Sequence, residues 1–105
     1  MSRKTFIPKS TQIFGRELKV EHKETKVSGL YGEINLRTGI VTLAKNTKEY
    51  PISPDELEVT YLHEITHFIL NKTGFEEKLV KAGIDLEDIV ETFAMGMYDA
   101  LKNSK

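Results

Sequence analysis

The sequence predicts an α+β fold with a small antiparallel sheet in its first half and helices in its second half. Before position 45, apolar residues partly alternate with polar ones or belong to β-branched runs, which is typical of strands. After position 53, apolar residues recur every three or four positions, which is typical of helices. With 105 residues the chain has the usual size of one domain, so we expect residues 1–105 to form a single domain.

The strands are expected in two regions. Residues 5–23 have irregularly spaced apolar positions interrupted by Pro8 and Gly15, which predicts one or two short strands. Residues 30–44 predict a hairpin more clearly, because they alternate with a period of two and then form a β-branched run. Gly39 lies in the connection of this hairpin, where a short loop needs a residue with positive φ.

A helix is predicted over residues 54–73. Ser53 is a typical N-cap residue, and Pro54 suits the first helical position. Glu56 follows the cap by three residues and can complete a capping box. Gly74 supplies the C-terminal stop of this helix.

Two more helices are expected after Gly74. Residues 76–82 predict a short helix that stops at Gly83, and Asp85 is the expected N-cap of a final helix. The apolar residues of the final helix form one stripe, which comprises Leu86, Ile89, Val90, Phe93, Met97, Ala100 and Leu101.

Composition excludes several classes of protein. Lys and Arg number 15 and Asp and Glu number 16, so the net charge of −1 predicts neither a nucleic-acid partner nor a membrane partner. The chain has no cysteine, so a metal ion would have to be held by histidine and carboxylate. The chain lacks the apolar segment of a secretory signal and any run near the ~20 residues that span a bilayer. We therefore expect a soluble cytoplasmic protein, and a monomer.

Residues 63–67 carry the clearest chemical motif, His-Glu-Ile-Thr-His, inside the predicted helix. His63 and His67 are one turn apart, so both imidazoles can reach one ion, while Glu64 is offset from it. A carboxylate beside an ion, and not bound to it, can take a proton from a water molecule that the metal activates. Average residue usage gives this pattern by chance in about one of a few hundred chains of this length. The alternative is a set of surface side chains on an amphipathic helix, which is how we interpret the third histidine, His22.

A catalytic zinc site needs a third protein ligand. Because no histidine follows His67 and the chain has no cysteine, a ligand from the C-terminal half must be a carboxylate. A glutamate at the start of the final helix can face the histidines if the two helices pack antiparallel, whereas Glu76 and Glu77 follow the helix break too closely. The candidates are Glu76, Glu77, Asp85, Glu87, Asp88, Glu91 and Asp99, of which Glu87 and Glu91 are favoured.

His-Glu-Ile-Thr-His on a capped helix, followed by a glutamate on a second helix, resembles the gluzincin group of zinc metallopeptidases. Residues 87–94 also resemble the E-x-x-A-[ND]-x-F-A signature of small regulatory peptidases of the ImmA/IrrE type, found in phages and mobile elements. Val90 replaces the alanine of that signature and Glu91 its Asn or Asp. In length and layout the chain is also similar to small phage-encoded proteins with an HEI-x-H motif.

The resemblance implies a minimal zincin-like domain that holds one catalytic zinc ion. It implies His63, His67 and Glu87 as the metal ligands and Glu64 as the general base. Glu91 follows Glu87 by four residues, and the resemblance implies that it orients a zinc-binding histidine. Aminopeptidase-like gluzincins place the ligand just before an x-F-A run, which would select Glu91 instead; we favour Glu87.

The activity that the resemblance implies is hydrolysis of peptide bonds in a peptide or protein substrate. Zincins generally bind substrate along a sheet edge, here the hairpin of residues 30–44, which would otherwise be plain core sheet. Tyr98 is a weaker candidate for an oxyanion donor, because a tyrosine at that position more often belongs to the core. The triplet of residues 95–97 falls in mid-helix, where packing explains its methionines.

Two other functions stay open. The first is a regulatory or binding module that keeps the zinc scaffold and cleaves nothing, which the small size of the chain favours. The second is a purely structural zinc protein. Glu64 argues against both, because a scaffold does not need an unliganded carboxylate beside the metal.

Overall fold

The computed structural model describes residues 5–24, 31–45 and 52–103. Within these residues the α+β class is confirmed, with strands in the first half and helices in the second. The predicted connection over residues 46–51 lies outside the described residues. The elements in chain order are β1 (Ser10–Ile13), β2 (Arg16–Lys23), β3 (Gly32–Asn35), β4 (Ile40–Ala44), α1 (Pro54–Thr73), α2 (Phe75–Lys81) and α3 (Leu86–Lys102).

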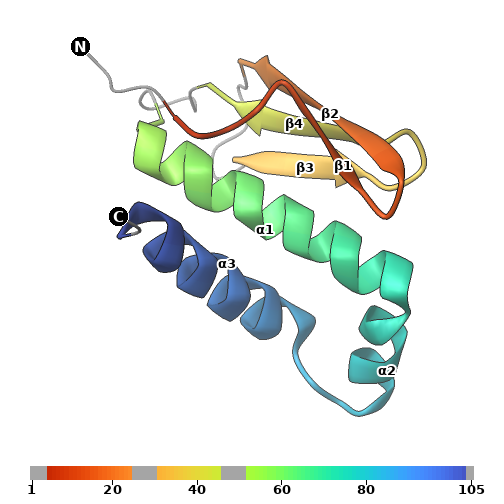
Figure 1. The fold of residues 1–105 in the computed structure, drawn as a ribbon. Coiled ribbons are helices and arrows are strands. Elements are labelled where there is room, and N and C mark those ends of the chain that lie inside the picture. The colour runs from red at the N-terminus through yellow and green to blue at the C-terminus, as the bar shows by residue number, and fades with distance from the viewer. Residues whose placement is uncertain (1–4, 25–30, 46–51, 104–105) are drawn as a thin grey trace.

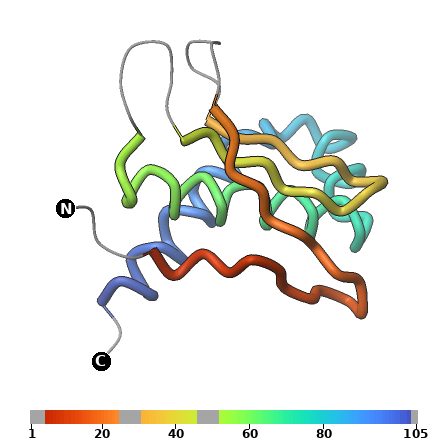
Figure 2. The backbone as a smooth tube through the Cα atoms, turned by 90° about the horizontal axis from the view of Figure 1, so that it is seen from above, coloured from red at the N-terminus to blue at the C-terminus, as the bar shows by residue number. Residues whose placement is uncertain are grey.

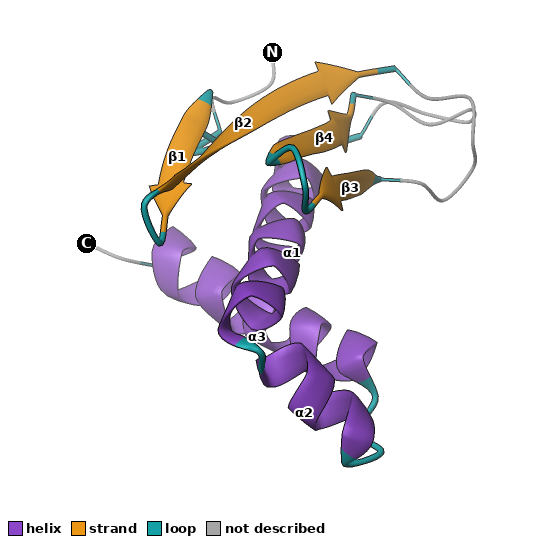
Figure 3. Ribbon diagram, turned by 90° about the vertical axis from the view of Figure 1, so that its right-hand side faces the viewer, coloured by secondary structure: helices purple, strands orange, loops and turns teal. Residues whose placement is uncertain are grey.

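The sheet has the strand order β1-β2-β4-β3, as Figure 3 shows. Both hairpins are antiparallel: β1 pairs with β2, and β3 pairs with β4 as the residues of 30–44 predict. The central pair, β2 and β4, is parallel. The expectation of an entirely antiparallel sheet was therefore wrong. The reason is the chain path: the chain reverses direction between β2 and β3, which lies at the outer edge, and reverses again between β3 and β4, so β4 runs parallel to β2.

The end signals of α1 act as the sequence predicts. The Oγ atom of Ser53 accepts a hydrogen bond from the Glu56 amide at 3.2 Å, and the Glu56 carboxylate accepts one from the Ser53 amide at 3.3 Å. Gly74 adopts φ 81°, the left-handed conformation that ends a helix without steric cost for glycine. The bounds of α1 coincide with the prediction, and α2 lies one residue earlier than predicted.

The helix α1 lies between the sheet and α3, so the molecule has three layers (Figure 1). Figure 2 shows α1 passing beneath the strands, and α3 runs antiparallel to it on the far side. Because α1 is covered on two sides, the polar face that carries the histidines packs toward α3. The buried core joins all three layers and consists of Leu18, Val41, Leu43, Tyr61, Leu62, Ile65, Phe68, Ala94 and Tyr98.

Only part of the apolar stripe of α3 packs against α1. Of the predicted stripe only Val90 is fully buried, and Phe93 and Leu101 remain 57% and 52% exposed. The buried row of α3 is Val90, Ala94 and Tyr98, and the last two lie outside the predicted stripe. Residues spaced by four positions form one row on a helix, and the row of Glu87 and Glu91 lies beside the buried row. This rotation of α3 therefore brings two carboxylates to the edge of the α1–α3 interface. Within the described residues, no helix is long and apolar enough to cross a membrane.

Candidate metal centre

The motif histidines lie on the side of α1 that faces α3. Their ring centroids are 4.9 Å apart, and each side chain is 20% exposed. Asp85 caps α3 by accepting a hydrogen bond from the Glu87 amide at 3.0 Å, which fixes the backbone of the first turn of α3, where Glu87 lies. His22 is exposed in β2, away from this group, as the sequence predicts.

Glu87 meets both motif histidines. One of its oxygens lies 3.3 Å from Nε2 of His63, and the other lies 3.1 Å from Nε2 of His67. One ligand atom from each of these three residues lies within 4.8 Å of the others. The antiparallel packing of α1 and α3 thus brings together the three side chains that the resemblance implies as ligands.

The dimensions of this group fit a zinc ion. Zinc bonds to histidine nitrogen and carboxylate oxygen are about 2.0–2.1 Å long, so a tetrahedral site keeps its ligand atoms about 3.3 Å apart. The distances of 3.1 and 3.3 Å run to the two different oxygens of Glu87, and one ligand atom from each of the three residues lies within 4.8 Å of the others, so the group is compact enough for its side chains to converge on one ion. Two imidazoles and a carboxylate are also a donor set that zinc accepts, with a fourth position left for water or substrate. The residues present therefore fit the ion.

Glu91 makes a different contact. Its Oε2 atom lies 3.1 Å from Nδ1 of His63, the ring nitrogen that faces away from Glu87. A carboxylate at Nδ1 favours the tautomer whose Nε2 carries the free lone pair, and Nε2 is the atom directed at Glu87. Of the remaining candidates, Glu77 pairs with Lys81 at 2.9 Å and Asp85 caps α3, and among the described residues none of them joins the group of His63, His67 and Glu87. The geometry therefore separates Glu87 from Glu91 where spacing along the chain did not.

Glu64 lies between α1 and the sheet edge with 7% of its surface exposed. Its carboxylate makes no hydrogen bond within the described part of the chain. Burial raises the pKa of Glu64 above its usual value, and the charges of His63 and His67 offset part of this effect. A carboxylate beside the histidines, with no donor holding its oxygens, is able to accept a proton.

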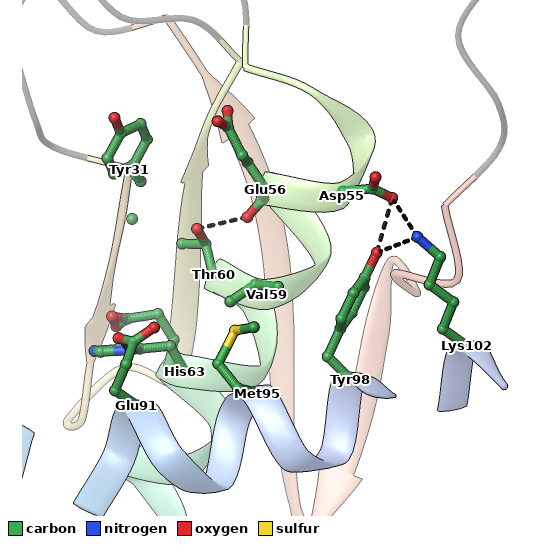
Figure 4. A pocket seen from close by; sticks show the side chains of 12 residues that line it. Tyr31, Asp55, Glu56, Val59, Thr60, His63, Glu91, Met95, Tyr98 and Lys102 are labelled. Atoms are coloured by element: carbon green, nitrogen blue, oxygen red, sulfur yellow. Dashed lines mark hydrogen bonds and ion pairs between the residues drawn. The ribbon is translucent and has the colours of Figure 1, made fainter. Parts of the chain in front are cut away.

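A cavity of about 710 Å³ opens beside His63, Glu64 and Glu91 (Figure 4). The start of β3 forms one wall, and α1 and α3 form the others. Gly32 allows β3 to lie close to α1, because a Cβ atom at this position would lie only 2.6 Å from the Cγ2 atom of Thr60 in α1. Within the described sheet β3 is an edge strand, and its first residue, Gly32, lines the cavity.

Tyr98 lies at the other end of this cavity. Its hydroxyl donates to Asp55 Oδ1 at 2.8 Å and accepts from Lys102 Nζ at 3.2 Å. Tyr98 follows Glu91 by two helical turns, about 10 Å along the axis. Tyr98 is a buried core residue, and its hydroxyl is engaged by Asp55 and Lys102.

Sequence reasoning missed several residues of the cavity wall. Met95 was assigned to packing but lines the cavity and is 43% exposed. Val59 and Tyr31 were not singled out. The one available signal was position: Val59 precedes His63 by four residues, and Met95 follows Glu91 by four, so both extend the rows that carry the metal-site residues.

Comparisons of the chain with protein families, with curated proteins and with solved structures find no match.

Proposed function

We propose that this protein is a zinc-dependent peptidase. The observation that carries the proposal is that Glu87 contacts both His63 and His67 in one compact group, beside Glu64, whose carboxylate has no hydrogen bond within the described residues. A site that only stabilised the fold would need the three ligands alone. The resemblance to the gluzincin group supports the same assignment.

The side chains divide the work among them. His63 and His67 would hold the ion through Nε2, and Glu87 would hold it through its carboxylate. Glu91 would keep the ring of His63 in the orientation that directs Nε2 at the ion. A zinc ion in this site would act as a Lewis acid: it would polarise the carbonyl of a peptide bond and lower the pKa of water, so that a base can remove a proton from the attacking water. Glu64 would take the proton from that water and pass it to the departing amine.

The free edge of β3 supports a peptide as the substrate. An extended peptide can add to an exposed strand through backbone hydrogen bonds. Gly32, the first residue of β3, and Tyr31 before it line the same cavity as His63 and Glu64. A peptide along this edge would therefore pass the proposed base and the metal ligands.

A non-catalytic zinc module remains the second candidate. The high exposure of the side chains of Glu87 and Glu91, 66% and 57%, favours it, because few walls surround the metal site on the side of α3. The two candidates predict different behaviour of Glu64, which a binding module would not need as a carboxylate.

The test compares the zinc-loaded parent with Glu64→Gln on unfolded casein. The variant keeps the size of the side chain and removes the proton acceptor, so cleavage should fall about 10²–10⁴-fold while one zinc ion stays bound. Glu76→Gln in α2 is the control, because it removes a first-turn glutamate away from the metal site and should leave cleavage unchanged. Equal cleavage by the parent and Glu64→Gln would contradict the proposal. If the parent protein binds no zinc, the contacts of Glu87 with the two histidines are ordinary ion pairs or hydrogen bonds, and the proposal is contradicted.

A further inference from the structure

The cavity beside the metal site is long enough to receive a substrate side chain. It extends from His63 and Glu91 to the first turn of α1, where Glu56 lines it (Figure 4). His63 follows Glu56 by seven residues, about 10 Å along the helix axis. The cavity is therefore long enough for one extended side chain of a bound peptide.

The middle of the cavity is apolar. Val59 on α1 and Met95 on α3 lie across from each other, and the ring of Tyr98 continues this surface (Figure 4). Met95 is 43% exposed although its side chain is apolar. An aliphatic chain lying between these residues would remove apolar surface from water, which is favourable by about 25 cal/mol per Å².

The far end of the cavity carries a net negative charge. Asp55 is paired, because it accepts a hydrogen bond from Tyr98 and lies 3.6 Å from Lys102 Nζ. The Glu56 carboxylate accepts a hydrogen bond from the backbone amide of Ser53 and has no cationic partner within the described residues. Among the described residues that line this end, Asp55, Glu56 and Lys102 sum to −1, and the N-terminus of α1 offsets about half a charge. The far end therefore favours a cation.

We propose that this cavity makes the site select substrates with a lysine or arginine close to the cleaved bond. These side chains join an aliphatic stem to a cationic head, which matches an apolar wall that ends at Glu56. The stem lies along Val59 and Met95, and the head lies at the Glu56 carboxylate. This inference rests on the proposed peptidase function and adds the class of substrate.

The test measures peptide binding to a protein that cannot cleave. Zinc-loaded Glu64→Gln is titrated by NMR with three acetylated and amidated pentapeptides, Ala-Ala-X-Ala-Ala, in which X is lysine, norleucine or glutamate. Norleucine keeps the stem of lysine and lacks its charge. The lysine peptide should bind about two- to fivefold more tightly than the norleucine peptide, the range of a partly exposed ion pair. Added salt should reduce this difference.

A second substitution assigns the effect to Glu56. Glu56→Gln in the Glu64→Gln background removes the charge, and glutamine can still complete the capping box with Ser53, so α1 should remain intact. This variant should bind the lysine and norleucine peptides equally. Glu76→Gln in the same background is the matched control and should keep the preference for lysine.

Several results would overturn the inference: equal binding of the lysine and norleucine peptides, tighter binding of the glutamate peptide, or no binding of the lysine peptide. A peptide with a free N-terminus that binds more tightly whether or not it contains lysine would assign the cation to the α-amino group instead. Failure of the proposed function would look different. It would leave casein uncleaved by the parent, whereas these titrations do not depend on cleavage.

Discussion

Two buried glutamates on α1, Glu58 and Glu64, differ in the hydrogen bonds that their carboxylates accept. Glu58, near the start of the helix, is 1% exposed and accepts a hydrogen bond from the backbone amide of Phe6 at 3.0 Å. Glu64, less than two turns further on, is 7% exposed and has no hydrogen bond within the described residues. Glu58 therefore links the backbone at Phe6 to α1, whereas Glu64 lies beside the histidines.

The difference shows how burial alone can mislead. A buried charge costs free energy unless donors compensate for it. The amide of Phe6 compensates Glu58, which accordingly has a structural role. Glu64 has no such donor within the described residues; its oxygens are accessible from the cavity that the residue lines, and burial raises its pKa. A carboxylate without a donor beside candidate metal ligands is the arrangement that a general base needs.

The largest expected effect on stability is that of the metal itself, in the region of Glu64. Zinc at about one hundred times its Kd should raise the free energy of unfolding by about 2.7 kcal/mol, because the ion binds only the folded chain. Glu87→Ala should abolish this gain, whereas Glu91→Ala should weaken zinc binding by about 10–100-fold. Urea denaturation with and without zinc measures both.

The opposite pattern in these two variants would make Glu91 the ligand. With excess chelator the protein should keep its helices by circular dichroism, because α1 has its own cap and packs on both the sheet and α3. Loss of helix on chelation would show that the ion is structural first.

The next largest effect on stability is expected at Glu58. Glu58→Ala should lower the free energy of unfolding by about 2 kcal/mol, since it removes the charged acceptor from the amide of Phe6. Glu58→Gln retains an acceptor and should lose less. Zinc affinity, measured by competition with a chelator, should be unchanged in both variants. A large loss of zinc affinity in Glu58→Ala would show that the two regions are not independent.

The smallest effect concerns Glu64 in the metal-free protein. Because burial raises the pKa of Glu64 in the folded state, the unfolded chain loses this proton at lower pH, and stability falls as the carboxyl ionises with rising pH. Glu64→Gln should therefore be more stable than the parent at pH 7. The difference should shrink toward pH 4, where the carboxyl of the parent is protonated. Urea midpoints at both pH values, with chelator present, test this; a pH-independent difference would contradict it.

Local signals predicted the elements well, and packing decided how they meet. The capping box of Ser53 and Glu56 and the stop at Gly74 place α1 at the predicted bounds, because these contacts lie within a few residues of each other. The parallel pairing of β2 with β4 joins distant segments, and no local pattern encodes it. The exposure of Phe93 likewise depends on how α3 rotates against α1, which the periodicity of α3 does not specify.

The sequence by itself determined the chemistry of the candidate site, since the spacing of His63, Glu64 and His67 on one helix follows from 3.6 residues per turn. It also limited the third ligand to a carboxylate. Only the tertiary structure places Glu87 against Nε2 of both histidines and Glu91 against Nδ1 of His63, because both glutamates lie on one row of α3 and their contacts depend on where that row crosses α1. The burial of Glu64 and the cavity beside it also arise from this layered packing of β3, α1 and α3.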